Sequence, residues 1–377
     1  MTSRSGAVAL LAGTALLAGC ASAASHPSSA PPAAAAAPLA TSMSVTGAGT
    51  WAIVAMGGSS ADQNNFWELF TRPAGSTQWE LVTPPGVADN GGLVASGGDG
   101  SLTVAFRPSQ GLTFSPLAST RDDGKTWATG LVDAAVAAVP DALAAGSGST
   151  LALLADGTIE QSSAASANWT KLATAGAIAT SPAGRQCQVT GLTAVAYTRS
   201  GSPLAAASCG RSGIVGIFAR TAAGTWQAAG PAAPGGDPVR VLRLTGTAAG
   251  DTALLESGTG SAASLFAAWT ADGTRWTTSS ALSTGSAQVL ASGTGPGSTA
   301  WVLLTDGRAA IIPGPGAAWR QLPAPPKGTA TLAAVSGTTV DALAVNGANL
   351  TVYQLTQGGT WTKTQSARVP IQYGSSS

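Results

Sequence analysis

Few residues in this sequence have side chains that could do covalent or acid–base chemistry. The chain has three cysteines (Cys20, Cys187 and Cys209), a single histidine (His26) and 17 aspartate and glutamate residues among 377. His26 lies in a stretch, residues 21–40, that contains only Ala, Ser, Pro, Leu and His. Such a stretch cannot bury enough apolar surface to fold. A mechanism that needs a positioned imidazole is therefore not expected.

The carboxylates are scattered, and many of them stand at turns. Asp156 and Asp306 each precede a glycine between two short apolar runs, which is a hairpin pattern. A glycosidase needs two carboxyl groups across a cleft, and the sequence assigns no such pair. The run 62–65 (Asp-Gln-Asn-Asn) could ligate Ca²⁺ or be a solvated loop, and we expect the loop. We therefore expect no catalytic residue, no metal site and no cofactor.

The charge balance narrows the choice of partners. The net charge is +1 and only 9% of the residues are charged. Nucleic acids and anionic lipid surfaces are bound through clustered lysine and arginine, which this chain lacks. We expect a monomer that does not bind nucleic acid.

The N-terminal segment has the pattern of an export signal. Arg4 precedes the apolar run 7–17, which is too short to span a bilayer, and Leu17-Ala18-Gly19-Cys20 follows. This tetrapeptide resembles the lipobox of bacterial lipoproteins. The resemblance implies a signal peptide over 1–19, lipid attachment at Cys20, and a membrane anchor on the outer side of the cytoplasmic membrane. The alternative is an ordinary secretory signal with a chance cysteine. In the lipoprotein interpretation, residues 20–41 are a lipidated tether that connects the anchor to the rest of the chain.

Seven tryptophans recur every 42 to 57 residues, each after a turn-forming run and at the start of a short strand-like segment. This period is typical of β-propeller blades with four short strands each. The blade markers are Trp79, Trp127, Trp169, Trp226, Trp276, Trp319 and Trp361. The sequence thus predicts an all-β fold, a seven-bladed propeller of four-stranded antiparallel blades over residues 42–373, with a disordered tail at 374–377.

Hairpin signals within the repeats agree with this prediction. Asn346-Gly347 separates two β-branched runs, and both turn positions require a positive φ that Asn and Gly tolerate. Apolar residues at helical spacing are not sustained anywhere without an interrupting Gly or Pro. The alanine-rich run 134–139 is cut by Pro140, so we expect a loop there.

The second repeat carries the most specific motif, Thr120-Arg121-Asp122-Asp123-Gly124-Lys125-Thr126-Trp127. Its Asp122 carboxylate can accept backbone N–H groups across a hairpin, and Gly124 supplies a backbone shape that a Cβ would resist. The motif resembles the Asp-box of a propeller group that includes sialidases, plant-polysaccharide hydrolases, the photosystem II assembly factor and sortilin-type receptors. The resemblance implies that Thr120, Asp122, Gly124, Thr126 and Trp127 are structural and lie away from the usual binding mouth.

The sialidase activity of that group is not expected here, because the Arg-Ile-Pro signature is missing and seven repeats replace six. Ligands of propellers usually bind the face formed by the connections between blades and by the turns between second and third strands. The charged residues expected on that face are Asp62, Asp89, Arg107, Arg211 and Asp237. Four further tryptophans could pack in the core or form a platform for sugars or peptides: Trp51, Trp67, Trp269 and Trp301. We expect a non-catalytic scaffold for a protein or an envelope polymer; the alternative is a glycan-active enzyme or lectin.

With Cys20 assigned to lipid, Cys187 and Cys209 remain as an even pair in an exported protein, which suggests a disulfide. In the repeat register Cys187 should begin the first strand of the fourth blade, and Cys209 should end the second. Adjacent antiparallel strands bring these positions together, with a bulge absorbing the difference in length. Two buried free thiols are the alternative.

Overall fold

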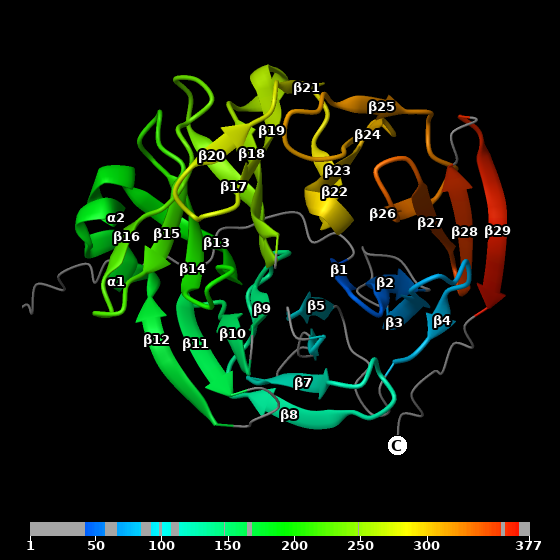
Figure 1. Cartoon of the computed structure of the whole chain (residues 1–377), viewed down its shortest axis with the longest axis horizontal. Coiled ribbons are helices and arrows are strands. Elements are labelled where there is room, and N and C mark those ends of the chain that lie inside the picture. The colour runs from blue at the N-terminus through cyan, green and yellow to red at the C-terminus, as the bar shows by residue number, and fades with distance from the viewer. Residues whose placement is uncertain are drawn as a thin grey trace, which may run out of the picture. The chain divides into compact units, whose positions relative to one another are not determined.

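The computed structural model describes residues 42–56, 66–83, 92–97, 100–106, 113–146, 148–163, 168–247, 249–355 and 359–368. The described strands form seven antiparallel sheets around a central axis (Figure 1). In every sheet the strands follow one another in chain order, from the innermost first strand to the outermost fourth. The predicted fold class is confirmed. All described residues belong to one compact unit.

The first four blades are regular. Blade 1 contains β1 (Ser42–Thr46), β2 (Gly49–Met56), β3 (Phe66–Pro73) and β4 (Glu80–Leu81). Blade 2 contains β5 (Gly92–Ser96), β6 (Leu102–Phe106), β7 (Ser115–Thr120) and β8 (Ala128–Val132). Blade 3 contains β9 (Leu143–Gly146), β10 (Ser149–Leu153), β11 (Thr158–Ser163) and β12 (Trp169–Thr174). Blade 4 contains β13 (Val189–Tyr197), β14 (Pro203–Cys209), β15 (Gly216–Arg220) and β16 (Trp226–Ala228).

The last three blades follow the same order with one addition. Blade 5 contains β17 (Val239–Thr247), β18 (Gly250–Ser257), β19 (Ala263–Thr270) and β20 (Trp276–Thr278), and β21 (Leu282–Gly285) also pairs with β19. Blade 6 contains β22 (Val289–Gly295), β23 (Thr299–Leu304), β24 (Ala309–Ile312) and β25 (Arg320–Leu322). Blade 7 contains β26 (Thr329–Ala334), β27 (Val340–Asn346), β28 (Asn349–Leu355) and β29 (Trp361–Arg368). Two 3₁₀ turns, η1 (Gly260–Ala262) and η2 (Pro296–Ser298), precede β19 and β23.

Two short helices between blades 3 and 4 were not anticipated: α1 (Ala175–Thr180) and α2 (Pro182–Cys187). Both begin at hydroxyl caps, because Thr174 accepts a hydrogen bond from the Ala177 amide and Ser181 accepts one from the Gly184 amide. Each helix has only six residues, too few for a helical periodicity to be visible in the sequence. Residues 134–139 form no helix, in line with the expected loop.

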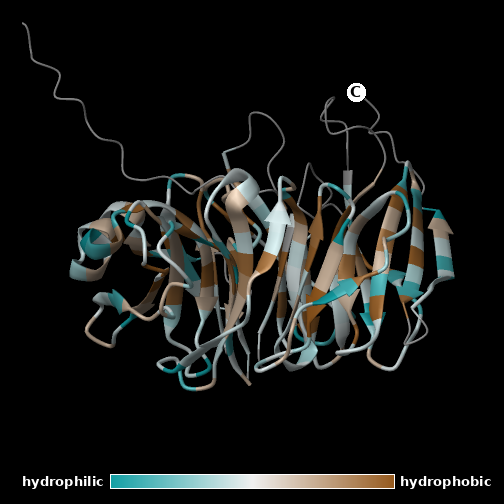
Figure 2. Ribbon diagram, turned by 90° about the horizontal axis from the view of Figure 1, so that it is seen from above, coloured by the Kyte–Doolittle hydropathy of each residue, from teal (hydrophilic) through white to brown (hydrophobic). Residues whose placement is uncertain are grey.

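Apolar side chains fill the spaces between neighbouring sheets. Figure 2 shows hydrophobic residues along the strands. The tryptophan markers contribute to this contact between blades. Four of them donate an indole hydrogen bond to a backbone carbonyl at the outer edge of the preceding blade. The pairs are Trp169 with Leu131 (3.0 Å), Trp276 with Ala229 (2.8 Å), Trp319 with Ser280 (3.2 Å) and Trp361 with Pro323 (3.1 Å). The repeat that identifies the blades thus also joins them.

Within the described ranges, blades 1 and 7 are joined through side chains, and neither sheet takes a strand from the other. The Gln365 side chain bonds both backbone groups of Trp79, accepting from N (2.6 Å) and donating to O (2.5 Å). The Trp79 indole donates to Asp341 (3.4 Å) instead of to a backbone carbonyl. Arg72 forms a buried ion pair with Asp341 (3.3 Å) and lies over the Trp79 ring. Gln354 donates to the other Asp341 oxygen (3.1 Å).

Candidate functional site

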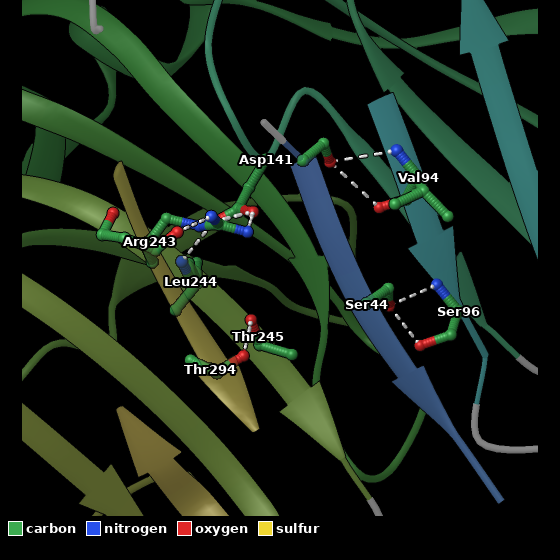
Figure 3. Close-up of polar contacts among 10 residues, drawn as sticks. Ser44, Val94, Ser96, Asp141, Arg243, Leu244, Thr245 and Thr294 are labelled. Carbon is green, nitrogen blue, oxygen red and sulfur yellow. Dashed lines mark hydrogen bonds and ion pairs between the residues drawn. The ribbon is translucent and has the colours of Figure 1, made fainter. Parts of the chain in front are cut away.

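Two hollows occur in the part of the chain that the structure describes and could hold a ligand. The first is a cavity of about 250 Å³ on the central axis, lined by the innermost strands of blades 1 to 6. Its hydroxyl groups pair with one another across blades (Figure 3). Ser44 bonds Ser96 (2.5 Å), and Thr294 donates to Thr245 (3.2 Å). These side chains join neighbouring strands and are therefore already engaged.

The charged groups of the axial cavity are also engaged. Arg243 and Asp141 are both buried, and the Arg243 Nε lies 3.0 Å from each Asp141 oxygen while Nη2 lies 2.7 Å from Oδ1 (Figure 3). The Leu244 amide donates to Asp141 Oδ2 (2.7 Å), and Arg243 Nη1 donates to the Ser292 carbonyl. This pair bridges blades 3, 5 and 6. A carboxylate so fully occupied is poorly placed to act as a general acid or base.

The second hollow is a groove of about 520 Å³ over blades 4, 5 and 6. It lies on the face formed by the connections between blades and the turns between second and third strands, which we call the upper face. The opposite face, formed by the other turns, is the lower face. The groove is lined by Ser208, Cys209, Pro238, Val239, Arg240, Glu256, Gly258, Thr259, Gly260, Ala263, Ser286, Ala287, Gln288 and Val289.

One ion pair supplies both charges of the groove. Arg240 and Glu256 stand opposite each other on the paired strands β17 and β18. The Arg240 Nε (3.0 Å) and Nη2 (2.6 Å) both donate to Glu256 Oε2. The side chains are 32% and 16% exposed, so the pair is accessible from the groove. The charges cancel, which leaves the groove close to neutral.

Backbone hydrogen bonds fix the walls of the groove. The Gly258 amide donates to the Pro238 carbonyl (3.2 Å), which ties the turn after β18 to the start of β17. On the far side, the Thr305 amide donates to the Gln288 carbonyl (2.9 Å), and the Gln288 amide donates to the Thr305 hydroxyl (3.1 Å). A groove with walls held in this way can bind a ligand with little ordering cost.

A disulfide lies where blade 4 borders the groove, because Cys209 is both a lining residue and a member of the bridge. Cys187 and Cys209 are joined, with Cα atoms 4.9 Å apart. Cys209 ends β14 as expected, but Cys187 is the last residue of α2 and does not begin the first strand of blade 4. The bridge therefore pins the helical insertion, unseen in the sequence, to the edge of the groove. The Arg211 amide adds a hydrogen bond to the Cys187 carbonyl (3.1 Å).

The charged residues expected on the binding face are only partly described. Arg211 and Asp237 are exposed on neighbouring loops of the upper face, where the Gly213 amide donates to the Asp237 carbonyl (3.4 Å). Asp62, Asp89 and Arg107 lie outside the described residues, as do Cys20 and His26. The sequence analysis did not select Arg240 or Glu256. Their only signal was opposite charge at positions that face each other once the β17–β18 hairpin is aligned.

The turn at Thr120–Trp127 lies on the lower face, between β7 and β8. Asp122 accepts hydrogen bonds from the Thr126 amide (2.9 Å), the Thr126 hydroxyl (2.6 Å) and the Thr120 hydroxyl (2.8 Å). These bonds, chiefly those from Thr126, lower the pKa of Asp122 to about 2. Gly124 has a φ of +82°, and a Cβ there would meet the Trp51 ring at 2.9 Å. Asp122 is thus an ionised structural carboxylate.

Three other carboxyl groups have a raised pKa, and each lies in a different blade. Burial raises the pKa of Glu160 in β11, and it raises that of Asp251 in β18 to about 6. Burial also raises the pKa of Asp341 in β27, although Arg72 opposes the shift. None of the three lines the groove or the axial cavity, and their blades, 3, 5 and 7, are not neighbours in the ring.

Among the described residues, no group of three or more His, Cys, Asp and Glu side chains could hold a metal ion. No helix in the same ranges is long and apolar enough to cross a membrane.

No protein-family model matches the chain, and no curated protein matches its sequence. Solved structures match its fold. YCF48 from Cyanidioschyzon merolae has a TM-score of 0.51 at 13% identity, covering 85% of this chain and 97% of its own. The periplasmic gluconolactonase of Pseudomonas aeruginosa has a TM-score of 0.56 at 13% identity, covering 85% and 96%. The GH74 xyloglucanase of Xanthomonas campestris has a TM-score of 0.56 at 15% identity, covering 86% of this chain and 53% of its own. This chain therefore spans about half of the xyloglucanase. Identities this low relate the fold and not the function.

Proposed function

We propose that this chain is an extracytoplasmic, non-catalytic binding module that holds a partner protein or an envelope polymer on the upper face of the propeller. The observation that carries the proposal is the groove over blades 4 to 6, whose walls are fixed and whose one ion pair is internally neutralised. Binding sites need preformed walls, whereas hydrolytic sites also need convergent titratable groups. The described titratable groups with raised pKa are on separate blades.

The propeller would act at the membrane surface as a monomer. The lipobox-like sequence that ends at Cys20 supports a lipid anchor on the outer side of the cytoplasmic membrane, with residues 20–41 as the tether. The hydrogen bonds of Asp122 within Thr120–Trp127 support the assignment to Asp-box propellers. Replacing Cys20 with serine should release the protein from membranes and leave the precursor uncleaved. A variant that stays membrane-bound and is processed normally would contradict the anchor.

Binding and turnover can be separated in one experiment. The mature protein is incubated with solubilised envelope proteins and, separately, with purified neutral polysaccharides, and products are followed by mass spectrometry over several hours. A binding module should retain a ligand at a stoichiometry near one and generate no products. Time-dependent release of oligosaccharides would support the alternative, a glycan-active enzyme. Retention of a glycan without products would indicate a lectin.

A further inference from the structure

The residues that line the groove have an unusual composition for a sugar site. Carbohydrate-binding surfaces commonly use aromatic rings, because their faces combine apolar area with defined geometry. None of the lining residues is aromatic. Five lining residues of blades 5 and 6 have small side chains: Gly258, Gly260, Ala263, Ser286 and Ala287. Small side chains leave backbone and narrow apolar surface accessible to an extended chain.

The ion pair has both donors and an acceptor that its own hydrogen bonds leave unused. Both of its hydrogen bonds run to Glu256 Oε2, from the Nε and Nη2 of Arg240. Within the described residues, Arg240 Nη1 and Glu256 Oε1 make no hydrogen bond. A guanidinium N–H beside a carboxylate oxygen is complementary to the C=O and N–H of one residue in an extended chain, which point to the same side of that chain. A charged ligand would instead have to compete with one member of the pair.

An exposed apolar residue directly follows the groove lining in sequence. Leu290 follows the lining residue Val289 and is 42% exposed, which is rare for a large apolar residue in this fold. It occupies a β-bulge, since the β22–β23 register skips from Val289 to Ala291. Bulges redirect a side chain from its usual face, and here the result is a leucine at the surface. An aliphatic side chain of a ligand could pack on it.

We propose that the groove binds an extended, uncharged peptide segment of a partner protein. The N–H and C=O of one residue in the extended segment bond Glu256 Oε1 and Arg240 Nη1, and an aliphatic side chain packs on Leu290. This inference rests on the proposed binding function and specifies its partner as a protein segment and not a glycan.

The test uses the full mature chain and two probe sets, a displayed decapeptide library without Asp, Glu, Lys or Arg, and an array of neutral glycans. We expect selected peptides to share an aliphatic residue at a fixed position. Their affinity should change less than about twofold between 50 and 500 mM NaCl, because no net charge is paired on binding.

Variants then locate the site. In the double variant Arg240→Leu/Glu256→Leu both charges are replaced together, which avoids an unpaired buried charge and should preserve the fold. It should bind selected peptides about tenfold more weakly, as should Leu290→Ser. Arg275→Ala on the lower face is the matched control and should bind normally. Unfolding temperature and an intact disulfide verify the fold of each variant.

The outcomes separate the two proposals. Peptides that bind the groove variants as well as the natural chain would overturn the peptide site. Glycans that bind, lose affinity in the double variant and are not hydrolysed would overturn the peptide inference but leave the binding function standing. If neither probe set nor any solubilised envelope component binds the chain, both proposals fail.

Discussion

Replacing Asp341 with asparagine should weaken the contact that closes the ring between blades 1 and 7. Asp341 and Arg72 are an ion pair whose side chains are only 2% and 7% exposed. Removing the charge from one partner leaves the other buried and uncompensated, which typically costs about 3–5 kcal/mol. The new amide can still bond Gln354 and Trp79, so we expect the lower end, about 3 kcal/mol. At about 2.1 cal/mol/K per residue, a propeller of about 330 residues should then lose about 4 °C in Tm.

Two separate assays test this: thermal unfolding gives Tm, and hydrogen exchange is measured on the folded protein. Exchange should accelerate first in β3 and β29, the strands on either side of the closure, and less in blades 3 to 5. Arg275→Ala is the control, because Arg275 forms an exposed pair with Asp272, 90% and 37% exposed, and such pairs contribute less than about 1 kcal/mol. If Asp341→Asn shifts Tm no more than the control, or accelerates exchange evenly around the ring, the closure does not depend on this pair.

Three other predictions concern single sites. Burial raises the pKa of Asp251 to about 6 from an ordinary 3.8, against a hydrogen bond from the Arg199 amide, so the ionised form destabilises the fold. Lowering the pH from 7.5 to 4 protonates Asp251 and should therefore raise the free energy of unfolding by about 3 kcal/mol. Asp251→Asn should raise Tm at pH 7.5 and flatten the pH dependence of Tm between pH 4 and 7. A pH profile of Tm that this substitution leaves unchanged would contradict the raised pKa. Replacing Cys187 and Cys209 by alanine should lower stability by about 3 kcal/mol and weaken groove binding, whereas two reactive thiols in the unreduced natural chain would exclude the bridge. Gly124→Ala should destabilise blade 2, because the position has φ +82° and faces the Trp51 ring; a Tm within 1 °C of the natural chain (about 0.7 kcal/mol) would refute the steric argument.

The blades could be predicted from the sequence because their signals are local. A tryptophan after a turn marks each outer strand. The hairpin signalled by Asn346-Gly347 also forms, but its two-residue turn is Gly347-Ala348, and only Gly347 of the predicted pair has a positive φ, at +57°. The Thr120–Trp127 turn is local in the same sense, since Asp122 bonds residues two and four positions away. Such signals survive without knowledge of the tertiary structure.

The ring closure and the axial ion pair could not be predicted, because their contacts join distant positions. Trp79 and Gln365 are 286 residues apart, and Asp141 and Arg243 are 102 apart. No local rule pairs them before the ring is built. The disulfide between Cys187 and Cys209 follows from the sequence, but the position of Cys187 at the end of α2 does not. The repeat register assigns Cys187 to a strand, because it offers no place for a helical insertion between blades.

We propose that this propeller binds its partner on the upper face, at the groove. This binding is tested most directly by a photo-crosslinking amino acid placed singly at two exposed positions of blade 5 in intact cells. These are Thr259 in the groove and Ala271 in the turn between β19 and β20 on the lower face. We expect a discrete crosslinked product from Thr259 that disappears in the Arg240→Leu/Glu256→Leu background, and none from Ala271. Equal crosslinking from both positions, or a product from Ala271 alone, would contradict it.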